Sequence, residues 1–165
     1  FARIASAMTP ENGAERAPNI LWAAGWAAAC TGARAAALLE TACEVALARA
    51  ESPRAAEIRS LAGDLRVRLD AMIEPGGGVE PDLLPEAALR CADLANLAAS
   101  NAEILPPGAA GAIVNLCAGA VRALRAALES GRPEDGLSGY APVETRSALW
   151  RVELAVRQLE ESGSA

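Results

Sequence analysis

Two long stretches of this chain carry no charged residue, and both are built largely from alanine and glycine. The first covers residues 17–33, a run of 17, and the second covers residues 104–121, a run of 18. A helix without charge on any side has to be covered by other helices or by lipid. The fold therefore has to supply enough surface to shield two such segments from water.

The composition favours helices throughout the chain. Alanine accounts for 41 of the 165 residues, whereas aromatic residues make up only 3%. Alanine is the best intrinsic helix former and a poor strand former. No useful length of the sequence alternates between apolar and polar residues as a half-buried strand does. The sequence therefore predicts an all-α protein.

Proline and glycine residues divide the chain into helices of predictable length. The expected segments are a short helix at 2–8 and longer helices at 19–51, 53–73, 84–103, 109–129 and 142–160. Ser52 precedes Pro53, a pair typical of a helix N-terminus. Because the connections are short, we expect a single domain over residues 1–165. This domain is an antiparallel bundle of five main helices plus a short N-terminal helix, with a long central helix.

The long helix indicates a partner chain. A helix of 33 residues is about 50 Å long, whereas a compact chain of this size has a gyration radius of about 15 Å. We therefore expect a homodimer whose second copy helps to cover the uncharged helices. Trp22, Trp26 and Trp150 are then either core residues or interface anchors. Membrane association is a weaker alternative, because both runs are short and contain an asparagine.

Charge and residue types exclude several functions. The net charge is −6, which argues against nucleic acid as a partner. The chain has no histidine, and all 15 basic residues are arginine. Serine–histidine catalysis, histidine metal sites, Schiff-base lysines and the phosphate-loop lysine are therefore excluded, and we expect no metal. The four cysteines form no CxxC pair, so we expect reduced, buried thiols and a cytoplasmic protein.

Acid–base chemistry is left mainly to carboxylates. Asp70 and Glu74 are four residues apart, so they lie on one helix face near its end. A carboxylate pair can split its pKa values and serve as acid and base. The alternative is that both are solvated or paired with Arg66 or Arg68. Asn115, within the second uncharged run, needs a partner if it is buried, either another helix or a ligand.

The order of these elements resembles the cyclodeaminase/cyclohydrolase family, typified by the C-terminal domain of formiminotransferase-cyclodeaminase and by methenyltetrahydrofolate cyclohydrolases. The resemblance rests on the short helix before Thr9–Pro10, the long small-residue helix after it, and the helices that follow. It spans residues 1–130. It implies an all-helical, dimeric protein that takes a tetrahydrofolate derivative as substrate and needs no other cofactor. Where the chemistry is retained, the activity would be that of a cyclohydrolase or an ammonia-lyase-type cyclodeaminase.

The chain departs from the family in its loops. The family's glycine-rich loop after the first helix becomes residues 8–13, which keep Thr9, Pro10 and Gly13 but introduce Glu11. The motif before the fifth helix is replaced by residues 105–109. For an enzyme of this kind, we expect Thr9, Asn12, Gly13 and Asn115 to be the ligand-binding residues and the carboxylates of Asp70 and Glu74 to be the catalytic ones.

Two functional hypotheses follow. In the first, the protein is a diverged enzyme that binds or converts a folate or a related cyclic one-carbon compound. In the second, it is a catalytically silent helical module that dimerises or docks a partner protein. The altered loops favour the second hypothesis, and the retained helix order favours the first.

Overall fold

The computed structural model describes residues 16–49, 52–73, 79–130 and 143–163. Within these ranges the chain forms α-helices and short 3-10 turns and contains no strand, which confirms the all-α prediction. The helices are α2 (Arg16–Ala48), α3 (Arg54–Ala71), α4 (Leu84–Ala99), α5 (Ala109–Ser130) and α6 (Val143–Ser162), with 3-10 turns at Pro81–Leu83 and Ala102–Ile104. The short helix expected at residues 2–8 lies outside the described residues.

Helix ends follow local chemistry. The hydroxyl of Ser52 accepts a hydrogen bond from the backbone N–H of Arg54 at 3.2 Å, as expected of a residue that caps α3. Helix α4 ends at Ala99, before the expected residue 103. Asn101 leaves the helical conformation, with φ −128°. Its buried side-chain amide donates to the carbonyl of Leu97 at 2.7 Å, so Asn101 closes the end of α4.

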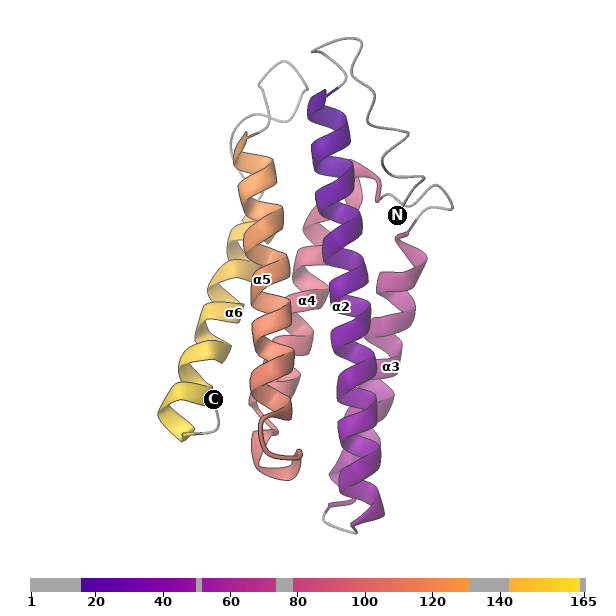
Figure 1. Cartoon of the computed structure of the whole chain (residues 1–165), viewed down its shortest axis with the longest axis vertical. Helices are drawn as coiled ribbons and strands as arrows, with labels where there is room; N and C mark the ends of the chain where they lie inside the picture. The colour runs from indigo at the N-terminus through magenta and orange to yellow at the C-terminus, as the bar shows by residue number, and fades with distance from the viewer. Residues whose placement is uncertain (1–15, 50–51, 74–78, 131–142, 164–165) are drawn as a thin grey trace.

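Consecutive helices run antiparallel and form two layers (Figure 1). In that view α2 and α5 lie in front, and α3, α4 and α6 lie behind them. Helix α2 has 33 residues, the predicted length, but α4 is the helix that packs against all four others. The long helix itself packs against α3, α4 and α5. The charges of α4 gather on one strip, which leaves alanine on its remaining sides to meet its neighbours.

Glycine and alanine allow the helices to approach closely. A Cβ atom added at Gly32 would lie 2.8 Å from Cys91 Sγ and 2.9 Å from Leu69 Cδ1. A Cβ atom at Gly25 would collide with Leu84. About half of the buried apolar residues are alanines. Small side chains bring backbones together, so that many weak dispersion contacts replace the burial of bulky groups.

One side of the front layer is left uncovered by the described chain. We call it the α2/α5 face. Its solvent-accessible residues are Ala23, Ala27, Thr31, Arg34, Leu38, Thr41 and Val45 of α2 and Ala112, Leu116, Gly119, Ala123 and Ala126 of α5. Within the described chain the outer sides of the two uncharged runs are exposed, and their expected cover by a second copy stays a prediction. Alanine tolerates water, so an absence of charge did not determine which side of each helix is buried.

Trp150 is not a core residue. Its side chain is 67% exposed on α6, on the same side as the exposed Val143 and Leu154. Trp26 is half-buried in α2.

We predict that Gly32→Ala lowers the free energy of unfolding by about 1–3 kcal/mol, because Cys91 and Leu69 have to move to admit one methyl group. The matched control is Gly63→Ala in α3, where the new Cβ meets Glu40 at an ordinary 3.7 Å. This control should raise stability by about 0.5–1 kcal/mol through helix propensity alone. Urea unfolding followed by circular dichroism measures both. Equal effects of the two substitutions would contradict the close packing of α2.

Candidate functional site

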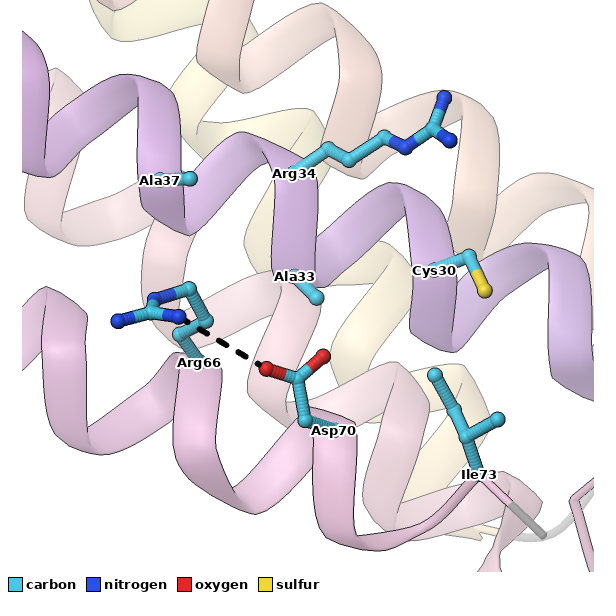
Figure 2. A pocket seen from close by; sticks show the side chains of 7 residues that line it. All are labelled: Cys30, Ala33, Arg34, Ala37, Arg66, Asp70 and Ile73. Carbon is cyan, nitrogen blue, oxygen red and sulfur yellow. Dashed lines mark ion pairs between the residues drawn. The ribbon is translucent and has the colours of Figure 1, made fainter. Parts of the chain in front are cut away.

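A groove of about 250 Å³ lies between α2 and α3 (Figure 2). It is open to solvent along one side. Its lining residues are Cys30, Ala33, Arg34, Ala37, Arg66, Asp70 and Ile73. We call it the α2/α3 groove. The lining residues follow a spacing of four and then three residues on each side: Cys30, Arg34 and Ala37 on α2, and Arg66 and Asp70 of α3 with Ile73 just after its end. Residues at this spacing lie on one side of a helix, so two antiparallel helices bring them face to face.

Asp70 is the one predicted catalytic residue that the structure places in this groove. Its carboxylate lies 3.9 Å from the Arg66 guanidinium, one turn earlier in α3. Arg66 is held more closely by α2, because its Nε donates to Glu40 Oε1 at 2.7 Å. Glu40 raises the pKa of Arg66 through this hydrogen bond and its charge. The alternative that Asp70 pairs with Arg66 is thus confirmed, although the contact is long. Glu74 lies outside the described residues.

Cys30 and Arg34 flank Asp70 from the α2 side, in different ways. Burial raises the pKa of the Cys30 thiol, Arg34 opposes this rise, and Asp70 adds to it. The thiol is therefore protonated near neutral pH and is a poor nucleophile. The guanidinium of Arg34 extends away from Asp70 and out of the groove in Figure 2.

The other predicted ligand-binding residues do not join this groove. Asn115 is exposed on α5 and is not among the residues that line the groove, so it needs no structural partner. Thr9, Asn12 and Gly13 lie outside the described residues. The structure therefore brings Asp70 together with Cys30, Arg34 and Arg66, which the sequence analysis did not select as site residues. No signal in the sequence selects Cys30 and Arg34, because only the packing of α2 against α3 brings them to Asp70.

A second group of charges holds α4 to α6. Arg151 donates to Asp93 at 2.6 Å, and Arg90 contacts Asp93 at 3.4 Å and Glu86 at 3.0 Å. Each acid has a basic partner, so the group is a balanced surface network that joins two helices. It leaves no carboxylate directed at a ligand.

The described residues offer little chemistry beyond binding. Among them no three histidine, cysteine, aspartate or glutamate side chains gather closely enough to hold a metal ion. The α2/α3 groove is lined by one carboxylate, that of Asp70, and by two arginines, of which Arg34 extends its guanidinium out of the groove. The half-exposed carboxylate of Asp70 can accept a cationic group.

Helix α5 is apolar enough to be tested as a membrane span. Residues Ala109–Glu129 are long enough to cross a membrane, and their most apolar 18 residues have a mean hydropathy of 1.4. Half of these 18 residues are buried inside the fold. The core helix of a soluble protein has the same properties, so this is weak evidence for a membrane. Comparisons with family models, with curated proteins and with solved structures find no match to this chain.

The buried thiols lead to a prediction about alkaline pH. Burial raises the pKa of Cys91 from 9.0 to about 12 and raises that of Cys117 well above 9.0. The folded thiols stay protonated while the unfolded ones ionise. Their contribution to stability is therefore fully present below pH 9.0 and decreases as the pH rises toward 12. We expect each thiol to lower the free energy of unfolding by up to ~1.4 kcal/mol per pH unit in this window.

Urea unfolding at about pH 8 and about pH 10.5 measures this loss. Cys91→Ala and the double variant Cys91→Ala/Cys117→Ala should flatten the dependence stepwise, whatever their stability at pH 8. The same slope in all three proteins would contradict the assignment to these thiols.

Proposed function

We propose that this protein is a catalytically silent helical scaffold that works as a homodimer through its α2/α5 face. The observation that carries this proposal is Gly119, which is exposed in the interior of α5 and whose added Cβ atom would meet nothing within 4 Å. Glycine inside a helix costs about 0.5–1 kcal/mol relative to alanine. Nothing described within the chain requires glycine at this position, whereas a helix that packs closely from outside does.

The pattern around Gly119 supports a helical partner. Exposed residues of α5 follow one another at spacings of four and three residues: Ala112, Leu116, Gly119, Ala123 and Ala126. The same spacing recurs along α2, at Ala27, Thr31, Arg34, Leu38, Thr41 and Val45. Spacings of this kind form the seams along which helices pack in coiled coils. Two parallel seams can receive two helices of another subunit.

A second copy of the chain is the occupant that the charges favour. Each chain carries a net charge of −6, so two copies repel each other over most of their surfaces. The α2/α5 face carries no acidic residue and a single arginine, so repulsion is weakest there. The polar Thr31, Thr41 and Arg34 on this face are unsuited to lipid.

The face is also large enough. Helix α5 has 22 residues and is about 33 Å long, and two adjacent helices are roughly 20 Å wide, which gives a flat area of roughly 650 Å². Side chains increase the contact area above this projection. A standard interface buries about 800 Å² per partner. The α2/α5 face therefore fits a dimer of ordinary size.

We predict that the protein elutes at twice the 16.9 kDa of one chain in light-scattering chromatography and dissociates on dilution. Leu116→Arg should weaken the dimer by at least ~100-fold, because it buries an unpaired charge in the interface. The matched control is Val67→Arg, an equally drastic change at an exposed residue of α3 outside this face. A wild-type monomer at every concentration, or equal effects of both substitutions, would refute the proposal.

A diverged folate enzyme is the second candidate. The observation that favours it is the position of Asp70, which lines the α2/α3 groove with a half-exposed carboxylate. A tetrahydrofolate derivative bound there would present its ring nitrogens to this carboxylate. With no histidine or lysine in the chain, Asp70 and Glu74 are then the groups that move protons.

This second candidate predicts a thermal shift with tetrahydrofolate or 5-formyl-tetrahydrofolate. Binding at 100 times the dissociation constant stabilises the folded state by about 2.7 kcal/mol. Asp70→Asn should abolish the shift, while Asp64→Asn, on the same helix, should preserve it. If a methenyl-folate is converted, Asp70→Asn and Glu74→Gln should each slow the reaction by about 100-fold. No shift at saturating ligand would remove this candidate and leave the scaffold unaffected.

For either function we propose a cytoplasmic location. All four cysteines are free, and Cys43, Cys91 and Cys117 are buried. Free thiols of this kind are usual in reducing compartments.

A further inference from the structure

We propose that the α2/α3 groove is completed by the second copy of the chain, with Arg34 of each subunit inserted into the partner's groove beside the partner's Asp70. This inference deepens the proposed function and rests on it, because it identifies the specific contact that fixes how two chains pair. It assigns to Asp70 a role in assembly instead of catalysis.

The first observation concerns Arg34. It is the only charged residue among the members of the α2/α5 face, and it lies near the middle of the α2 seam. Among the described residues no carboxylate lies within ion-pair distance of it. Figure 2 shows its guanidinium extended away from Asp70, over the outer side of α2. An interface that covers this face has to provide a carboxylate for Arg34, since a buried guanidinium without a partner is costly.

The second observation concerns the groove. Asp70 is the only carboxylate among the residues that line the groove, and its ion-pair partner Arg66 is held mainly by Glu40, at 2.7 Å compared with 3.9 Å for Asp70. The carboxylate of Asp70 is therefore only weakly neutralised, and 52% of its side-chain surface is exposed. Ala33, Ala37 and Ile73 form apolar walls beside it. Such walls exclude water from an incoming guanidinium and strengthen its attraction to the carboxylate.

The third observation is the position of both groups relative to α2. Arg34 projects from the same turns of α2 that supply Cys30 and Ala37 to the edge of the groove. A two-fold interface brings the same patch of both subunits together, so it needs a donor and an acceptor on one patch. Arg34 and Asp70 meet this requirement. A dimer with α2 packed against the partner's α2 then contains two such pairs.

Charge reversal tests whether the pair forms between subunits. Arg34→Glu places two carboxylates at each contact, and Asp70→Arg places two guanidinium groups there. We expect each variant alone to dimerise at least ~30-fold more weakly than the wild type, because both contacts of the dimer become repulsive. An equimolar mixture of the two variants should recover near-wild-type affinity, since every contact in the mixed dimer again joins opposite charges. The double variant Arg34→Glu/Asp70→Arg should recover affinity for the same reason.

The matched control is Arg68→Glu, an equal charge reversal at an exposed residue of α3 that does not line the groove. It should leave dimerisation unchanged, and circular dichroism checks that every variant is folded. If the wild type is a monomer, the proposed homodimer and this inference both fail. If the wild type dimerises and neither reversal weakens it, or if the mixture does not recover, only the inference fails. A pair within one chain would be repaired by the double variant but not by the mixture.

Discussion

The close approach of helices through glycine and alanine is the constraint on which the rest of this structure depends. At Gly32 there is no room for one methyl group between α2 and the side chains of Leu69 and Cys91. A core of small residues buries little apolar area per residue, so each helix has to be contacted on several sides to gain enough dispersion energy. Helix α4 meets this need completely, because it packs against all four other described helices.

The same constraint explains why the α2/α5 face is exposed in the described chain. The outer sides of α2 and α5 carry mainly alanine and other small residues, whereas their inner sides also bury larger ones such as Leu39, Ile113 and Leu124. A bulky core would have enclosed a single hydrophobic centre and left polar residues outside. The small residues on the outer sides of α2 and α5 instead leave a surface against which a further helix can pack closely.

Much of the fold was predictable from the sequence because the residues that begin and end its helices act locally. Proline, glycine and a serine cap define helix ends through backbone geometry, so the starts of α3 and α5 were placed within a residue or two. The end of α4 was not, because Asn101 closes it through a side-chain hydrogen bond that composition does not reveal. The orientation of α2 and α5 was not predictable either. Alanine is compatible with both water and the core, so their sequences do not say which side faces inward.

The candidate site was predictable only in part, for a related reason. The pairing of Asp70 with Arg66 follows from a spacing of four residues within one helix, which the sequence displays directly. The contributions of Cys30 and Arg34 come from another helix about forty residues away, and only the packing of α2 against α3 reveals them. Asn115 was selected because it is a polar residue within an uncharged run, yet it lies on the exposed side of α5 and needs no buried partner.

The chemistry of the α2/α3 groove and the exposure of the α2/α5 face point to the same use of the molecule. The groove contains the Asp70 carboxylate, its ion-pair partner Arg66, and the Cys30 thiol, whose pKa is raised by burial. These groups are suited to holding a charge in place. Arg34 is not held by an ion pair within the described chain, and Figure 2 shows its side chain extending out of the groove. A dimer satisfies the groove, the arginine and the uncharged face at once, whereas a small ligand in the groove satisfies only the first.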